Sequence, residues 1–282
     1  GPLIRSLFLP EEGCKWGTFD YSQQEPRLVT EYALRFGLAS VNKIADAYDS
    51  DPKADFHQVV ADMAKIPRSQ AKVINLGLFY GMGKAKLEAE LGVSSVKAKN
   101  LFDSYHAKVP FVKQLTNELM RAAQSQGRIK TILNRKCRFP KYEPILKGND
   151  WGRFVPAQDH ERMLELQAMG PHMKDEEGEF ILDKDGNKQK NYWHENGHRR
   201  AFTYKALNKL IQGSAADMTK KAMLELYKEG ITPHIQIHDE LDISVESDEQ
   251  ANKIKDIMEH AVELRIPNKV DYESGPNWGT IK

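Results

Sequence analysis

The sequence predicts an α+β protein in which a long helical block interrupts a small antiparallel sheet. Apolar runs typical of strands lie near the start of the chain, at 15–20, and near its end, at 233–237 and 241–245. The two late runs flank a polar corner at 238–240, as in a tight turn between antiparallel strands. Most of the sequence over 55–126 has the apolar spacing and terminal signals of helices. Strands and helices grouped apart in this way are typical of the α+β class.

Local signals place the individual elements in chain order. Asp55 is an N-cap residue for the helix that follows it, and Pro67 occupies a first helical turn, where proline is tolerated. Gly127 is a stop signal at the end of the helical block. The expected elements are a strand at 15–20, helices at 25–36, 55–63, 67–80, 84–91, 94–105 and 110–126, a strand at 128–133, a helix at 201–228, strands at 233–237 and 241–245, a helix at 248–264 and a short final strand.

The region from about 141 to 198 is the least periodic part of the chain. Glycine, asparagine, aspartate and proline are scattered through it, so it is interpreted as an insertion. Within it, apolar runs at 179–182 and 188–193 flank Asp185-Gly186, which predicts a β-hairpin. We expect no catalytic role for this insertion.

Composition excludes several classes of protein. The 282 residues contain 41 Lys and Arg against 40 Asp and Glu, a net charge of +1 that argues against binding to polyanions through a basic tail. With 40% hydrophobic residues the chain is typical of a globular protein. The two cysteines, Cys14 and Cys137, cannot form a metal cage by themselves. No apolar run reaches the roughly 18 to 20 residues of a membrane span, so no membrane partner is expected and the predicted compartment is the cytoplasm.

Two carboxylates stand where strands end. Asp20 ends the first strand, and Asp239 lies at the tip of the late hairpin. If those strands are neighbours, both carboxylates point into one cleft, where hard oxygen ligands would hold Mg²⁺ for phosphoryl transfer. Each aspartate taken alone is more typical of a turn.

A stripe of four side chains follows the helix that Pro67 opens. Arg68, Lys72, Leu76 and Tyr80 recur every four residues and therefore share one side of that helix. The two cations could meet a triphosphate there, and the tyrosine could meet a base or sugar; a solvated face is the alternative interpretation. His57, on the preceding helix, could donate to the same phosphates or could be a partly buried structural histidine.

Three segments in this order carry a family resemblance. Residues 20–27 resemble motif A, residues 68–81 resemble motif B and residues 236–241 resemble motif C of family A DNA polymerases, the relatives of bacterial DNA polymerase I and many phage replicases. Lesser blocks at 55–57, 127–140, 206–213 and 277–278 agree in order and spacing. The resemblance covers the whole chain apart from about 141–198, an insertion that is itself phage-like.

The resemblance implies a fold and a domain division. Residues 1–43 and 200–282 would form a palm with an antiparallel sheet, and residues 44–199 a mostly helical fingers subdomain that includes the insertion. Family members carry a helical thumb, and usually a 3′–5′ exonuclease domain, before the segment that matches residues 3–8. Because neither is found in this sequence, a separate or removed N-terminal portion is an expected partner. A phage-encoded chain would act in the host cytoplasm.

The reaction implied is the transfer of dNMP from a dNTP to a primer 3′-hydroxyl on a DNA template. Two Mg²⁺ ions, with Mn²⁺ as a possible substitute, would be held by Asp20, Asp239 and the backbone carbonyl of Tyr21. Glu240 matches a carboxylate near these metals, and Lys72 is a candidate proton donor to the leaving pyrophosphate.

The resemblance also assigns substrate contacts. Glu25 matches the steric gate that excludes ribonucleotides. Leu76 stands where the family usually has Phe or Tyr, so sugar discrimination is in question, and Tyr204 replaces an arginine common in bacterial members. The expected dNTP-binding residues are Tyr21, Gln23, Glu25, His57, Arg68, Lys72, Leu76 and Tyr80. The expected primer-template contacts are Thr131, Arg135, Asn208, Gln212 and His238.

Two alternative functions remain open at the level of sequence. A single-subunit RNA polymerase shares the palm layout, although Glu25 at the gate position argues against it. A non-catalytic DNA-binding subunit of a split polymerase would need no thumb of its own, although Asp20 and Asp239 are both present.

Overall fold

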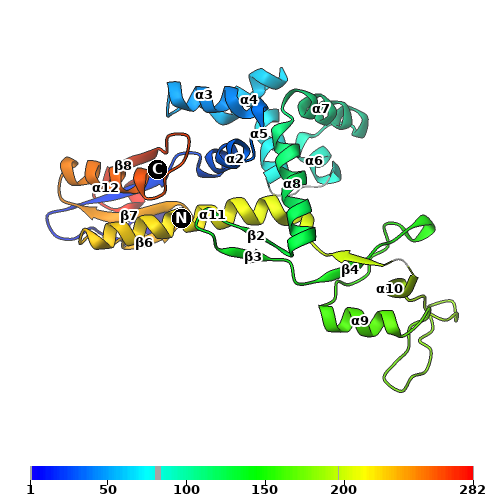
Figure 1. The fold of residues 1–282 in the computed structure, drawn as a ribbon. Helices are drawn as coiled ribbons and strands as arrows, with labels where there is room; N and C mark the ends of the chain where they lie inside the picture. The colour runs from blue at the N-terminus through cyan, green and yellow to red at the C-terminus, as the bar shows by residue number, and fades with distance from the viewer. Residues whose placement is uncertain (1, 80–83, 196, 282) are drawn as a thin grey trace. The chain divides into compact units, whose positions relative to one another are not determined.

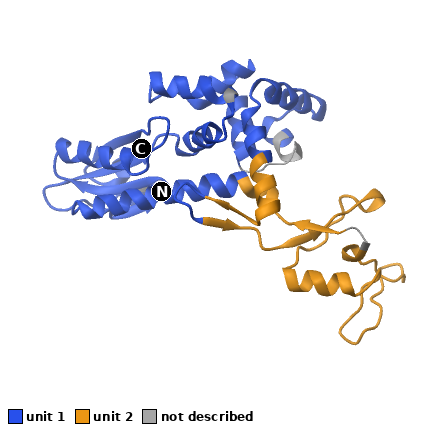
Figure 2. Cartoon of the chain, in the orientation of Figure 1, with its two compact units in different colours: residues 1–117, 131–135, 207–282 blue, residues 118–130, 136–206 orange. Residues whose placement is uncertain are grey.

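The structure is a computed structural model that describes residues 2–79, 84–195 and 197–281. It divides into two compact units, one made of 1–117, 131–135 and 207–282 and the other of 118–130 and 136–206 (Figure 2). The first unit combines the sheet with most of the helices (Figure 1). These boundaries differ from those expected for palm and fingers, so that division stays a prediction.

The larger unit is organised around a four-stranded sheet in the order β6-β7-β1-β8. Its central strand β1 (Lys15–Tyr21) pairs antiparallel with β7 (Glu240–Val245) on one side and with β8 (Val270–Gly275) on the other. β6 (Ile235–Ile237) completes the hairpin with β7 (Figure 1). Strands from the two ends of the chain therefore lie side by side, as the predicted α+β class requires.

Successive side chains of β1 point to opposite faces of the sheet. Phe19 and Tyr21 are buried, and the hydroxyl of Tyr21 donates to the backbone oxygen of Met258 at 2.6 Å. On the opposite face the indole of Trp16 and the hydroxyl of Thr18 both donate to one carboxylate oxygen of buried Asp242, at 3.0 and 2.7 Å. These hydrogen bonds from β1 side chains to Asp242 on β7 therefore help to fix the register of the two strands.

The helices mostly begin where capping residues predict. The carboxylate of Asp55 accepts the backbone N–H groups of His57 and Gln58 at 2.8 and 3.1 Å and so caps α4. The helices that lie in the larger unit are α1 (Pro2–Arg5), α2 (Gln24–Arg35), α3 (Asn42–Ser50), α4 (Phe56–Ala64), α5 (Arg68–Phe79), α6 (Lys84–Leu91), α7 (Ser95–Lys108), the first part of α8 (Phe111–Gln126), α11 (Ala206–Lys228) and α12 (Asp248–His260).

Several predicted boundaries were wrong. The strand expected over 128–133 ends at Lys130, because Thr131 to Arg135 form a turn in which Asn134 has a left-handed φ of 64°. The helix expected from 201 begins at Ala206, after a 3₁₀ turn that follows Phe202 at φ 61°. α12 ends at His260 rather than 264.

The smaller unit contains the region interpreted as an insertion. β2 (Arg128–Lys130) pairs with β3 (Lys136–Arg138), and β4 (Tyr142–Pro144) pairs with β5 (His198–Arg200). The hairpin predicted around Asp185-Gly186 is present as antiparallel bridges, including Leu182 opposite Lys188. Two helices that were not predicted, α9 (His160–Ala168) and α10 (Tyr192–Glu195), bury Met163, Leu166 and Trp193 together.

Candidate active site

The two predicted catalytic aspartates lie at the same end of the sheet, where β1 ends and the β6–β7 turn lies. β6 and β7 are joined by the two-residue turn His238-Asp239, in which His238 has a φ of 54°. The backbone N–H of Tyr21 donates to the backbone oxygen of Asp239 at 3.4 Å, directly after Asp20. Asp20 is also the register partner of Glu240. The structure therefore brings together carboxylates that are far apart in the sequence.

This end of the sheet is electrostatically crowded. The carboxylate of Asp20 reaches solvent, yet partial desolvation and the negative charges of Asp239 and Asp271 raise its pKa to about 6. Burial raises the pKa of Asp239 as well. Desolvation, followed by the charges of Asp242 and Asp20, raises the pKa of Glu240 to about 7. Each of these carboxylates is therefore ionised at a cost that a nearby cation would reduce.

The donor set fits a divalent cation that shares its ligands with a substrate. Within residues 2–79, 84–195 and 197–281, no group of three or more histidine, cysteine or acidic side chains is arranged to hold a metal alone. Two carboxylates and a backbone carbonyl are hard oxygen ligands, and Mg²⁺ typically takes one or two protein carboxylates and completes its shell with water and phosphate oxygens. Asp20, Asp239 and the carbonyl of Tyr21 match that chemistry.

A pocket of about 670 Å³ opens beside Asp239. It is lined by residues from the start of α2, the middle of α11 and the β6–β7 turn. Four of the predicted substrate contacts and one predicted catalytic residue are therefore gathered around one cavity: Gln23, Glu25, Gln212, His238 and Asp239. A second pocket of about 740 Å³, lined by residues within 49–53 and 259–269, contains none of the predicted site residues.

The predicted phosphate contacts lie together on α4 and α5. Arg68 forms an ion pair with Asp55 at 2.5 Å, next to the N-terminus of α4. His57 is buried, and desolvation lowers the pKa of its imidazole; Asp55 opposes that shift, whereas Arg68 and Lys72 add to it. Arg68 and Lys72 therefore lie close enough to His57 to act on it electrostatically, and their binding of phosphate stays a prediction. Leu76 is half-buried one turn beyond Lys72, and Tyr80 lies outside the described residues.

Gln23 has a role in the fold that the sequence did not predict. Its left-handed conformation, φ 53°, starts α2. The side-chain amide donates to the backbone oxygen of Ala54 at 3.0 Å, and its carbonyl accepts the backbone N–H of Phe56 at 2.9 Å. Gln23 therefore connects the segment after β1 to the start of α4, and its expected contact with dNTP stays a prediction.

Four of the five predicted primer-template residues lie on α11 or in the turn at 131–135, and the fifth, His238, lies in the β6–β7 turn. Arg135 donates to the carboxylate of Asp217 at 2.7 Å and to the backbone oxygen of Gly213 at 2.6 Å. The hydroxyl of Thr131 accepts the backbone N–H of Arg135 at 3.0 Å. Gln212 is exposed at the pocket and Asn208 is half-buried one turn earlier. Their contacts with DNA stay predictions.

Arg27 is a structural residue of this site that was missed. It is 1% exposed, and its guanidinium donates to the backbone oxygens of Ser22 at 2.8 Å, Pro267 at 2.5 Å and Pro52. It also lies over the ring of Tyr48, 4.3 Å from the ring centroid. An arginine among the apolar positions of a helix was the available signal, since a buried charge needs fixed partners.

Comparison with known proteins identifies the family. The sequence profile of DNA polymerase family A matches residues 1–280, so the chain belongs to that family. A DNA-directed DNA polymerase of Pseudomonas phage M6 is 33% identical over an alignment of 318 residues, gaps included. The alignment covers 98% of this chain and 40% of the phage protein. DNA polymerase I of Geobacillus stearothermophilus is 28% identical to this chain. That alignment covers 100% of this chain and 28% of the length of the Geobacillus protein.

A solved structure supports the fold. The POL domain of Pol1 from M. smegmatis, in complex with DNA primer-template and dNTP, has a TM-score of 0.67 at 24% identity, over 99% of this chain and 42% of that one. The mixed fold with antiparallel strands is therefore confirmed. The chain spans 40% of the length of the phage relative. Across the described residues, none of the helices is both long and apolar enough to cross a bilayer.

The raised carboxylate pKa values predict how the stability of the cation-free chain depends on pH. A Glu240 with a pKa of about 7 in the folded chain and about 4 when unfolded binds more protons when folded between those values. Its contribution to stability is therefore lost as pH rises from about 4 through 7. We expect Glu240→Gln to raise the melting temperature relative to wild type at pH 8 in EDTA, but to give no such gain at pH 4.

The comparison between variants removes the effects of other titrating groups. His57 acts in the opposite direction, because its pKa is lowered and the unfolded chain gains protons there as pH falls. Melting temperatures by scanning calorimetry at pH 4 and pH 8 give the difference, and Glu249→Gln on α12 is the matched exposed control. An increase in melting temperature at pH 4 as large as that at pH 8 would contradict a raised pKa of Glu240 in the folded chain.

Proposed function

We propose that this chain is the catalytic portion of a DNA-directed DNA polymerase that adds dNMP from dNTP to a primer 3′-hydroxyl. The observation that carries the proposal is the joining of Asp20 and Asp239 at one end of the sheet, through the hydrogen bond from Tyr21 to Asp239. Membership of DNA polymerase family A supports it. The pocket beside Asp239 offers room for the reacting groups.

Asp20, Asp239 and the carbonyl of Tyr21 would hold two divalent cations, with Glu240 close by. When bound, Mg²⁺ or Mn²⁺ would lower the pKa of the primer hydroxyl and neutralise charge on the triphosphate. The chain itself contributes rigidity: β1 and the β6–β7 turn fix both carboxylates on paired strands. Rigid placement matters because misplacement by about 1 Å can cost a hundredfold in rate.

Arg68, Lys72 and His57 would bind the triphosphate. Arginine and lysine supply charge-assisted hydrogen bonds, which are roughly twice as strong as neutral ones. The exposed ammonium of Lys72 is also proposed to donate a proton to the leaving pyrophosphate. Leu76 and Tyr80 would lie beside the nucleotide sugar and the templating base.

Gln212 and His238, at the pocket, and Asn208, Arg135 and Thr131, on or beside α11, would contact the primer-template. Minor-groove acceptors occur on every base pair, so polar side chains there can check pair geometry without reading sequence. The ion pair with Asp217 holds the side chain of Arg135 against α11.

A further N-terminal portion, with thumb and exonuclease, is a proposed partner. Five large apolar side chains between positions 3 and 9 are exposed, and exposed apolar patches commonly mark interfaces. The test is primer extension with Mg²⁺ and dNTPs by this chain, with and without that portion from a phage relative. DNA binding without any extension under both conditions would favour a non-catalytic subunit instead.

Glu25 allows a test against the RNA polymerase alternative. It lines the pocket beside Asp239, where a gate against the ribose 2′-hydroxyl would stand. We expect Glu25→Ala to raise the ratio of ribonucleotide to deoxynucleotide incorporation by about 10- to 100-fold, the usual effect of a steric change in a binding pocket. Single-nucleotide insertion with dNTP and rNTP measures the ratio.

The control for this change is Glu249→Ala on α12, an exposed glutamate that lies outside the pocket. It should leave the ratio at the wild-type value. A wild-type chain that already prefers rNTP would overturn the DNA polymerase assignment.

A further inference from the structure

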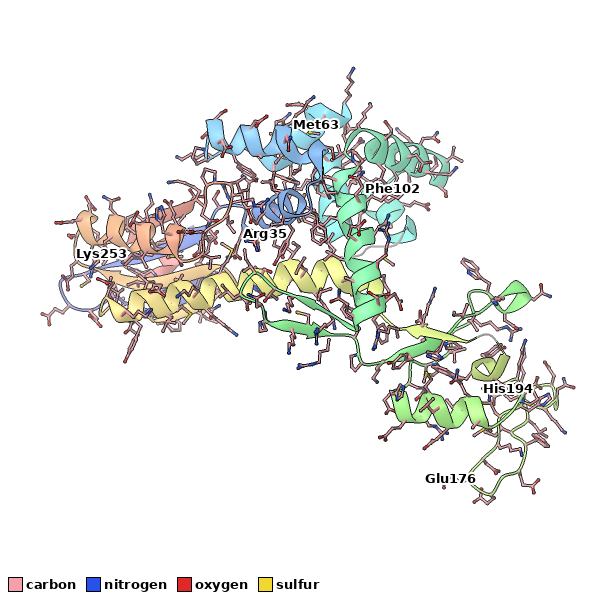
Figure 3. The ribbon with its side chains drawn as sticks, in the orientation of Figure 1. Arg35, Met63, Phe102, Glu176, His194 and Lys253 are labelled. Atoms are coloured by element: carbon pink, nitrogen blue, oxygen red, sulfur yellow. The ribbon has the colours of Figure 1, made fainter. Side chains whose placement is uncertain are left out.

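A buried polar chain links three helices behind the proposed phosphate site. The Nδ1 atom of His57, on α4, lies 3.0 Å from the side-chain nitrogen of Asn75 on α5. The side-chain oxygen of Asn75 accepts a hydrogen bond from the hydroxyl of Tyr105 on α7. Met63 and Phe102 mark α4 and α7 in Figure 3. His57 is 8% exposed, and Asn75 and Tyr105 are 0% exposed.

The donors and acceptors in this row of hydrogen bonds determine which nitrogen of His57 carries the proton. An amide nitrogen can only donate, so a ring nitrogen that faces it must accept. The proton of a neutral imidazole must then be on Nε2. In this structure the hydroxyl of Tyr105 donates to the amide oxygen of Asn75, and the amide nitrogen therefore faces His57.

We propose that Asn75 and Tyr105 are positioning residues that hold His57 as the neutral Nε2–H tautomer, so that it donates to an oxygen of the incoming triphosphate. The identity of that anion rests on the proposed function; the tautomer does not. The opposite tautomer would present a lone pair to the phosphates and repel them. Asn75 and Tyr105 are both buried. Breaking either hydrogen bond would therefore leave a buried polar group without a partner, which is energetically costly.

The charges around His57 are compatible with a neutral donor. Asp55 faces it from the start of α4, and Arg68 and Lys72 face it from α5. Desolvation is the largest influence and lowers the pKa of the imidazole, so the ring is neutral at pH 7. The two cations would attract the same anion to which Nε2–H donates.

The direct test is long-range ¹H–¹⁵N NMR of the full chain, with the His57 signals identified by their loss in His57→Gln. We expect the nitrogen shifts of the Nε2–H tautomer between pH 7 and 8. Shifts of the Nδ1–H tautomer, or of an equal mixture, would overturn the proposal. The measurement requires no polymerase activity, so it stands even where primer extension fails.

Asn75→Asp is the most informative variant because it keeps the shape of the side chain and replaces the donor by an acceptor. A carboxylate beside Nδ1 favours a proton there, so we expect the pKa of His57 to rise by about one unit or more. Tyr105→Phe should produce a mixture of tautomers without adding charge. Tyr32→Phe, which removes a buried hydroxyl paired with Ser214, is the matched control and should leave the His57 signals in place.

Inorganic tripolyphosphate serves as the probe for the role in binding. At pH 8 we expect Asn75→Asp and Tyr105→Phe to weaken its binding by about three- to tenfold, consistent with the loss of one hydrogen bond. The Tyr32→Phe control should bind it as wild type does. Unchanged affinity in both variants, alongside the expected change in tautomer, would overturn the positioning role toward the triphosphate.

Discussion

Asp239→Ala is expected to reduce primer extension with Mg²⁺ by about a thousandfold or more. Metal ligation of reacting oxygens contributes several kcal/mol of stabilisation to the transition state, and about 4 kcal/mol corresponds to a factor of a thousand. Asp239 lies in a two-residue turn, where no neighbouring side chain on the same turn is acidic. Its loss would therefore remove a proposed metal ligand whose backbone is hydrogen-bonded to Tyr21.

Rapid-quench measurement of a single dNTP insertion gives the size of this effect. Asp239→Asn keeps the shape and removes the charge, so it should lose nearly as much activity as the alanine variant. Asp256→Asn, on the exposed side of α12, is the control for loss of one negative charge. Equal insertion rates for wild type and both Asp239 variants would eliminate the proposed two-metal site.

Arg27→Met is expected to lower the free energy of unfolding by about 3–5 kcal/mol, because three buried hydrogen bonds from a charged donor are lost, at about 1.5 kcal/mol or more each. The methionine fills a similar volume but leaves the backbone oxygens of Ser22, Pro52 and Pro267 without the guanidinium that binds them. Those three oxygens belong to separate segments of the larger unit, so the substitution loosens all of them together.

Urea denaturation followed by circular dichroism measures this loss. Arg121→Met removes an exposed arginine that is paired with Glu118, and it should cost about 1 kcal/mol or less. An Arg27 variant as stable as the Arg121 variant would show that water replaces the guanidinium at little cost. A large loss confined to Arg27 would support its role as a connection between α2 and the two loops.

The sequence was most informative where local chemistry decides the structure. Asp55 marks the start of α4 through its own side chain, and the polar corner at 238–240 marks the hairpin. The helices α3 and α9 were missed: α3 is short, and α9 lies within polar, irregular sequence. The helix start at Ala206 depends on Phe202 adopting a left-handed conformation, which a residue of that type rarely does.

The candidate site was predictable where one residue type has one obvious chemistry. Asp20 and Asp239 stand out as carboxylates at strand ends, and the register of β1 with β7 brings those ends together. Asn75 and Tyr105 could not be selected from sequence, because buried polar residues are defined by partners on other helices. Gln23 was expected to bind substrate, and only the structure shows its hydrogen bonds to the α4 connection.

The position of β1 in the sheet has a consequence for synthesis of the chain. β1 leaves the ribosome long before its two neighbours, β7 and β8, which both lie beyond residue 239. Until they emerge, both edges of β1 are without their native strands, and such edges can pair with other chains. Folding must also wait for these long-range pairings, which makes it slow compared with local helix formation. The carboxylates proposed as metal ligands are therefore brought together in the same late step that gives β1 its neighbouring strands.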